Sequence, residues 1–185
     1  MGASAGGLDA LAGVLAELPA TFSLPILVVQ HRHASDCSDF ARFFDGHSLL
    51  AVLEPCDKEL IRGGHVYLAP ANYHMLVERN GTISLSLEPL VHWSRPSIDV
   101  LFESAASAWG TDAIGVLLTG ANADGAGGMR RIRAASGLTI AQEPATASSR
   151  TMPEAAIRAA AVDLVLPPAA IGRFLAGLRQ KEGGP

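Results

Sequence analysis

The chain has few charged residues and few cysteines, and these shortages exclude several classes of protein. Charged residues make up 17% of the 185 residues and the formal net charge is −4, so we expect no binding of nucleic acid. Cys37 and Cys56 are too few for a disulfide framework and match no zinc spacing, which favours a reducing, cytoplasmic setting. Since no apolar run approaches the roughly 20 residues of a membrane span, we also expect no direct membrane insertion. No signal-peptide pattern follows Met1.

What the chain does contain is an alternation of short apolar runs and helix-like segments. This alternation predicts an α/β fold: a doubly wound, mostly parallel sheet with helices on both faces. The pair Asn80-Gly81 lies between two further apolar runs and predicts an antiparallel hairpin at one edge. Predicted strands cover residues 24–29, 65–68, 75–77, 83–87, 113–118, 138–141 and 164–166, and predicted helices cover residues 8–18, 97–109, 127–135, 153–160 and 168–179.

We expect a single catalytic domain over residues 1–179, followed by a polar tail over residues 180–185. A glycine-rich turn of the kind found at residues 2–7 normally follows a strand. Only Met1 precedes it here, so we expect the first strand of this domain to be truncated.

The turn at residues 2–7 matches the nucleophile-elbow pattern Gly-x-Ser-x-Gly. Small neighbours allow a sharp turn that projects the hydroxyl of Ser4, while the next helix offers backbone N–H groups to an oxyanion. The alternative is a glycine turn that only caps a helix. A dinucleotide site is disfavoured because it needs glycine at position 4, and because the next strand ends in Gln30-His31 where an acidic residue is required.

His31 and Asp124 follow two other predicted strands, at the carboxyl edge where open α/β sheets place their sites. His31 can act as the base for Ser4 through Nε2, with Nδ1 bonded to Asp124. Taken alone, His31 is also compatible with a solvated loop histidine, and Asp124 is also compatible with an Asp-Gly turn or the cap of the next helix. A metal site on His31, His33 and Asp36 is a weaker alternative because a further histidine ligand is lacking.

Read together, these motifs resemble the catalytic domain of chemotaxis protein-glutamate methylesterases of the CheB type. The resemblance spans residues 1–175 in order. The motifs that carry it are Gly2-Ala3-Ser4-Ala5-Gly6-Gly7, Val28-Val29-Gln30-His31, Gly64-His65-Val66-Tyr67-Leu68-Ala69-Pro70, Arg95-Pro96-Ser97-Ile98-Asp99, Leu118-Thr119-Gly120 with Asp124-Gly125, Ala141-Gln142-Glu143 and Met152-Pro153.

The resemblance implies Ser4 as nucleophile, His31 as general base and then acid, and Asp124 as the residue that orients His31. Backbone N–H groups of Ala5 and Ala121 would form the oxyanion hole. No cofactor and no metal would be needed. Arg95 is a candidate for binding the substrate helix, with a structural ion pair as the alternative.

The implied reaction is hydrolysis of glutamate γ-methyl esters on the cytoplasmic helices of methylated chemoreceptors, with deamidation of receptor glutamines as a second activity. Receiver, methyltransferase or sensor modules are the expected fused or associated partners. The chain departs from the family pattern at Ala5, Ala121 and Asn122, where Thr and Met-Gly are common. A catalytically weak or inactive module that binds receptors or a sensor kinase is therefore the alternative function.

Overall fold

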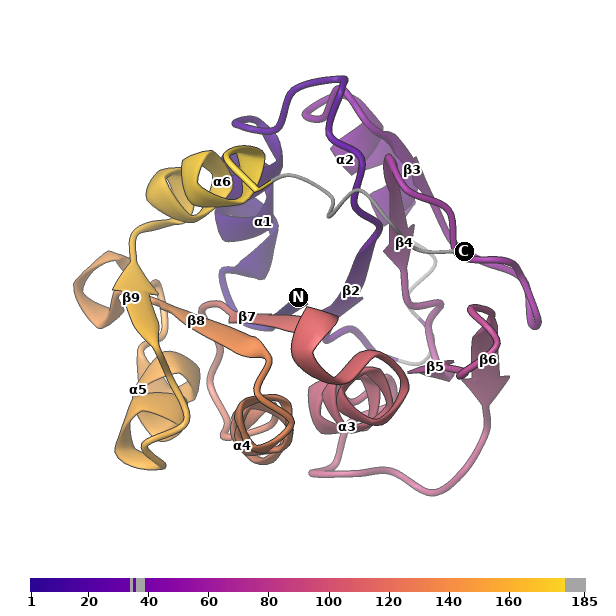
Figure 1. Cartoon of the computed structure of the whole chain (residues 1–185). Coiled ribbons are helices and arrows are strands. Elements are labelled where there is room, and N and C mark those ends of the chain that lie inside the picture. The colour runs from indigo at the N-terminus through magenta and orange to yellow at the C-terminus, as the bar shows by residue number, and fades with distance from the viewer. Residues whose placement is uncertain (34, 36–38, 179–185) are drawn as a thin grey trace.

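A parallel sheet of seven strands forms the centre of the protein in this computed structural model, which describes residues 1–33, 35 and 39–178 (Figure 1). Every pairing between its strands is parallel, and the strand order is β3-β4-β2-β1-β7-β8-β9. The strands are β1 (Gly2–Ala3), β2 (Ile26–Gln30), β3 (Ala51–Leu53), β4 (His65–Leu68), β7 (Ile114–Leu117), β8 (Leu138–Gln142) and β9 (Leu164–Leu166).

Helices cover both faces of this sheet (Figure 1). Along β2, Ile26 and Val28 belong to one apolar core while Leu27 and Val29 belong to the other. Burial on both faces explains why the strand reads as a continuous apolar run. One face carries α1 (Gly7–Leu15), α2 (Phe40–Asp45) and α6 (Pro168–Ala176), and the other carries α3 (Ile98–Trp109), α4 (Ala126–Ala134) and α5 (Thr151–Arg158).

The predicted hairpin is present as β5 (His74–Val77) and β6 (Ile83–Ser86), with Gly81 at φ 80° in the turn. It forms a two-stranded antiparallel sheet of its own, and the Val77 N–H donates to Ser104 Oγ of α3 at 3.0 Å. The predicted fold class is confirmed. The elements β3 and α2 were not predicted, and the tail after residue 178 lies outside the described residues.

Strand β1 has two residues and lies at the middle of the sheet. Gly2 is opposite Val29 of β2 and Leu117 of β7, and the Met1 ammonium donates to the carbonyl oxygen of Leu27 at 2.6 Å. A cavity of about 820 Å³ opens beside Met1, at the amino ends of β2 and β7 and thus opposite the edge where the predicted site residues lie.

Candidate active site

The point at which the chain reverses its direction across the sheet lies at β1. The chain runs from β1 to β2 and β4 on one side, and β7, β8 and β9 lie on the other. Ligand sites of open α/β sheets form at such a switch point, outside the carboxyl ends of the strands. Ser4 follows β1, His31 follows β2 and Asp124 follows β7, so the topology brings the three predicted residues to one edge.

Backbone hydrogen bonds hold the turn that carries Ser4. The Ser4 N–H donates to the carbonyl oxygen of Thr119 at 2.9 Å, and the Gly7 N–H donates to the Ser4 carbonyl at 2.8 Å. Gly6 has φ 74°, a left-handed conformation that glycine adopts without steric cost. A Cβ atom at Gly6 would also lie 2.5 Å from Ser148 Cβ, so this position needs glycine for two reasons.

The side chains of Gln30 and Thr119 brace the same turn. Gln30 Nε2 donates to the carbonyl oxygens of Ser4 and His31, both at 3.0 Å. Thr119 Oγ1 donates to the carbonyl oxygen of Ala5 at 2.9 Å and accepts from the Ser149 N–H at 2.9 Å. Gln30 and Thr119 are both buried, and together they fix the position of the turn that carries Ser4. Nothing in the sequence indicated this role.

His31 is in contact with the carboxylate of Asp124. The distance between His31 Nε2 and Asp124 Oδ2 is 2.8 Å, and the His31 N–H donates to the Ala3 carbonyl at 2.9 Å. The expected ring orientation was wrong: Nε2 faces the aspartate, so Nδ1 is the nitrogen left for Ser4. In the described part of the chain, no hydrogen bond joins Ser4 Oγ to His31.

Asp124 is fully buried and accepts four hydrogen bonds. Its Oδ2 accepts from His31 and from the Ile98 N–H at 2.7 Å, and its Oδ1 accepts from Ser97 Oγ and the Asp99 N–H, both at 3.0 Å. Burial raises the pKa of this carboxyl, but the hydrogen bonds from His31 and the two N–H groups outweigh burial and leave the pKa below its ordinary value.

The donors to Asp124 come from the start of α3. Ser97 is the N-cap residue of this helix, and the Ile98 and Asp99 N–H groups belong to its first turn. Such N–H groups have no partner within the helix, and the positive end of the helix dipole favours an anion. Ser97 and Asp99 belong to one of the motifs that resemble the family, but nothing in the sequence indicated that they contact Asp124.

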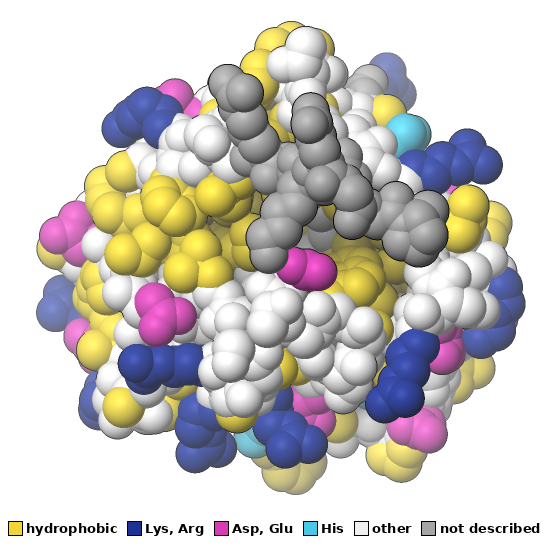
Figure 2. Space-filling model, in the orientation of Figure 1, with side chains coloured by type: hydrophobic (Ala, Val, Ile, Leu, Met, Phe, Trp, Pro, Cys, Tyr) yellow, Lys and Arg dark blue, Asp and Glu magenta, His cyan; other side chains and the backbone are white. Residues whose placement is uncertain are grey.

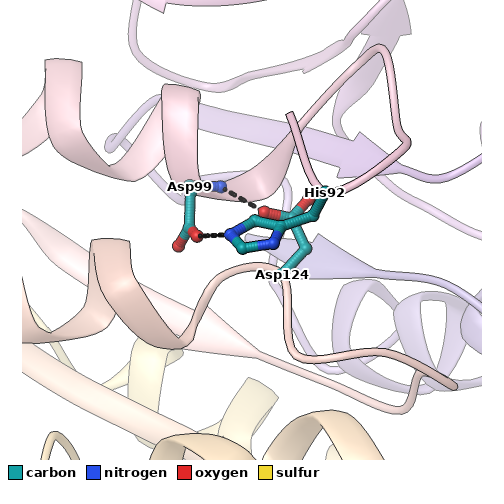
Figure 3. A group of neighbouring side chains, drawn as sticks. All are labelled: His92, Asp99 and Asp124. Atoms are coloured by element: carbon teal, nitrogen blue, oxygen red, sulfur yellow. Dashed lines mark hydrogen bonds and ion pairs between the residues drawn. The ribbon is translucent and has the colours of Figure 1, made fainter. Parts of the chain in front are cut away.

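A second carboxylate lies directly beside this network (Figure 3). Asp99 Oδ1 accepts from the Gly128 N–H at 2.6 Å, and Asp99 Oδ2 lies 3.1 Å from His92 Nε2. Burial raises the pKa of Asp99, and the charge of Asp124 raises it further, against the lowering effects of Gly128 and His92.

His92, Asp99 and Asp124 offer ligand atoms within 4.8 Å of one another, as a metal site would. Each of the four carboxylate oxygens already accepts from a N–H or O–H donor or faces the His92 ring. The donor set therefore fits a hydrogen-bond network between α3 and the Asp124 loop better than it fits a cation.

The backbone N–H groups of Ala5 and Ala121 donate no hydrogen bond to any described residue. Both residues are exposed, and both lie at the edge of the sheet that carries Ser4. The side chain of Asn122 turns back into its own loop, where Oδ1 accepts from the Asp124 N–H at 3.2 Å. Two unused donors are therefore present in the segments where the oxyanion hole was predicted.

The remaining predicted site residues lie outside this network. The Arg95 guanidinium donates to Asn72 Oδ1 at 2.7 Å and to the carbonyl oxygens of Leu87 and Glu88, both at 2.8 Å. His33 is exposed and lies 2.7 Å from Ser35 Oγ. Asp36, the third member of the alternative metal site, lies outside the described residues.

In Figure 2, both Lys or Arg and Asp or Glu side chains lie around the described surface, and several Lys or Arg side chains lie near one another at the lower left. Over the described part of this face, charges of one sign do not form a large continuous area. Within the described ranges, no helix is both long enough and apolar enough to cross a membrane.

Comparison with known proteins gives consistent matches. A family model described as CheB methylesterase matches residues 1–175. A Leptospira interrogans protein named putative protein-glutamate methylesterase/protein-glutamine glutaminase is 45% identical over 166 residues, which cover 90% of this chain and 86% of that protein. A Rhodospirillum rubrum protein named protein-glutamate methylesterase/protein-glutamine glutaminase 2 is 43% identical over 90% of this chain, which spans 47% of that longer protein. The crystal structure of the Thermotoga maritima CheB methylesterase catalytic domain matches with a TM-score of 0.90 at 32% identity, over 95% of this chain and 94% of that one.

Proposed function

Since this chain belongs to the CheB methylesterase family, we propose that it is a protein-glutamate methylesterase that uses Ser4, His31 and Asp124. The observation that carries the proposal is the 2.8 Å contact between His31 Nε2 and the buried Asp124 carboxylate, next to the braced turn of Ser4. A carboxylate that fixes one histidine nitrogen leaves the other free to accept a proton.

In the proposed reaction, Ser4 Oγ attacks the ester carbonyl carbon while His31 Nδ1 takes the hydroxyl proton. The tetrahedral intermediate collapses by breaking its bond to the methoxy oxygen, and His31 gives the proton to that oxygen. Methanol leaves, and the glutamyl group remains as an ester on Ser4 Oγ. Water then attacks this acyl-enzyme with His31 as base, which regenerates Ser4 and releases the glutamate carboxylic acid. The low pKa of Asp124 keeps its carboxylate charged beside the imidazolium formed in each step.

The unused N–H groups of Ala5 and Ala121 support a role as oxyanion donors. A preorganised donor of this kind contributes about 10²–10³ in rate. The proposal includes deamidation of glutamine by the same steps with ammonia as leaving group, as the relatives' printed names imply for them. The proposed substrates are the cytoplasmic helices of chemoreceptors, with receiver, methyltransferase or sensor modules as partners in the cytoplasm.

Two observations favour the alternative of a weakly active binding module. Ser4 Oγ makes no hydrogen bond to His31 in the described structure, and Ala5 and Ala121 replace residues common in the family at the proposed oxyanion hole. Catalytic hydrogen bonds are often long without substrate and tighten only in the complex, so an open Ser4–His31 pair is compatible with an active enzyme.

Methanol release from a methylated chemoreceptor cytoplasmic fragment separates them. We expect release by the wild type and none above background by Ser4→Ala, while Ser107→Ala, which alters an exposed serine on α3, serves as the matched control. A fluorophosphonate probe should label the wild type and the control but not Ser4→Ala. Equal methanol release by Ser4→Ala would refute the proposal, and loss of activity with a chelator would favour the metal alternative.

A further inference from the structure

The segment before α3 contains a tight two-residue turn, His92-Trp93. The Val91 N–H donates to the Ser94 carbonyl at 3.1 Å, and the Ser94 N–H donates to the Val91 carbonyl at 2.9 Å. Trp93 at the tip is 94% exposed, more than any other large apolar residue of the described chain. Solvent exposure of a whole indole ring is unfavourable and marks a candidate contact site.

Both central residues of this turn have positive φ, 48° at His92 and 61° at Trp93. A type I′ turn requires positive φ at both positions and favours Asn-Gly. A bulky side chain is unfavourable in this region, and such a conformation persists only where the surroundings impose it. The turn therefore presents tryptophan at a position where the backbone would prefer glycine.

Three side chains hold this turn and the segments on either side of it. His92 Nε2 lies 3.1 Å from Asp99 Oδ2 at the start of α3 (Figure 3). The buried His74 ring accepts from the Ser97 N–H at 3.2 Å and donates from Nε2 to the Pro89 carbonyl at 3.1 Å. The hydrogen bonds of Arg95 described above tie Asn72 to residues 87–88.

This turn lies beside Asp124, the buried member of the proposed triad. A ring nitrogen of His92 and an oxygen of Asp124 lie within 4.8 Å of each other. Asp99 links the two residues, because its carboxylate faces the His92 ring and its N–H donates to Asp124 (Figure 3). His92, the residue directly before Trp93, therefore lies beside Asp124, which in turn contacts His31.

Further exposed apolar side chains lie on the segments that Arg95 ties together. Leu87 is 58% exposed, Leu90 is 55% exposed and Tyr73, next to Asn72, is 38% exposed. An exposed aromatic residue has the properties of a binding hot spot, because little side-chain entropy is lost when it is covered.

We infer that Trp93 anchors the protein substrate by packing on the apolar face of the helix that carries the glutamyl methyl ester. This inference rests on the proposed function, because a side-chain ester on a protein brings the surface of its own helix to the rim of the site. The His92–Asp99 pair fixes the position of Trp93 relative to Asp124.

The test compares two substrates that share the reacting ester. One is a synthetic helical peptide with a γ-methyl glutamate and an apolar face, and the other is the same ester on a single capped amino acid. For Trp93→Gly we expect the ratio of kcat/KM for the peptide to kcat/KM for the capped amino acid to fall at least about tenfold, mainly through KM. Because glycine suits φ 61°, the thermal midpoint should not fall.

Two variants complete the design. Trp93→Phe should retain most of the ratio because an aromatic ring remains, and Val165→Ala removes a 44% exposed apolar side chain on edge strand β9 as the matched control. An unchanged ratio in Trp93→Gly, or an equal loss on both substrates, would overturn the inference. Altered sedimentation with an unchanged ratio would identify a second copy of the chain as the occupant and would overturn it too. If the wild type releases methanol from neither substrate, the proposed function itself fails.

Discussion

The two ends of the proposed triad are built in different ways. At the acid end, the buried Asp124 accepts four hydrogen bonds, three of them from the start of α3, and this arrangement is complete without substrate. At the nucleophile end, Ser4 is held only through its backbone, and no hydrogen bond joins its hydroxyl to His31 in the described structure.

The side-chain hydrogen bonds of the proposed triad are thus concentrated at Asp124 and not at Ser4. In the proposed mechanism, the carboxylate that supports the imidazolium is fixed in advance by a helix N-terminus, so it would need little reorganisation during the reaction. The position of the nucleophile depends on a short glycine turn that Gln30 and Thr119 support. Changes at the acid end should therefore reduce stability and activity together, whereas changes of the Ser4 hydroxyl should reduce activity alone.

Asp124→Ala should have the largest effect. It leaves the buried donors of Ser97, Ile98 and Asp99 without their acceptor, so we expect the free energy of unfolding to fall by about 3 kcal/mol or more. Loss of the orienting carboxylate should lower kcat by about 10⁴. Urea unfolding and methanol release measure the two effects. Ser4→Ala is the control and should keep its stability within about 0.5 kcal/mol; wild-type stability in Asp124→Ala would contradict the role of Asp124 as helix cap.

Gly7→Ala tests the nucleophile end. A Cβ at this position would lie 2.0 Å from Gln30 Oε1 and 2.8 Å from Ala3 Cβ, so we expect a loss of about 1–3 kcal/mol in stability. Because Gln30 supports the Ser4 carbonyl, a shift of this side chain should lower kcat by up to about 10².

A double-mutant cycle with Gln30→Ala identifies the cause of that loss. If the clash with the Gln30 amide is responsible, the double variant should be more stable than the two separate losses predict, since truncation of Gln30 removes the clashing atoms. Additive losses would show that the contact with Ala3 dominates. Gly13→Ala on the same helix is the matched control, since its Cβ would meet an ordinary contact at 3.5 Å.

Ser97→Ala should have a smaller effect than either. It removes the N-cap hydroxyl of α3 and one of the four donors to Asp124, while the Ile98 and Asp99 N–H groups remain. Loss of an N-cap residue of this type costs about 0.5–2 kcal/mol. Thermal unfolding and kcat measure the change, and Ser97→Thr should restore most of both. A loss as large as that of Asp124→Ala would mean that the hydroxyl is the main anchor of the carboxylate.

Sequence reasoning predicted the fold, and it placed the three candidate residues at the ends of strands that meet at one edge of the sheet, because β-branched runs, the Asn80-Gly81 turn and strand ends are local signals. It missed β3 and α2, which have three and six residues and too little periodicity to recognise. It also missed the capping of α3 by Asp124, because the bonded groups are about 26 residues apart and most are backbone N–H groups. The orientation of the His31 ring likewise depends on the path of the Asp124 loop, which no short motif encodes.

The smallest predicted effect is a difference in pH dependence between the neighbouring carboxylates Asp99 and Asp124. The pKa of Asp124 lies below its usual value of 3.8, so its contribution to stability is present above pH 3.8 and is lost as the pH falls through its folded pKa. The pKa of Asp99 is raised, mainly by burial, so the folded state binds this proton more readily and gains stability as the pH falls towards 3.8. In urea unfolding between about pH 3 and pH 7, the stability of the wild type relative to Asp99→Asn should therefore rise on acidification, whereas its advantage over Asp124→Asn should shrink below pH 3.8. Parallel pH profiles for the two variants would show that the two carboxylates do not differ in this way.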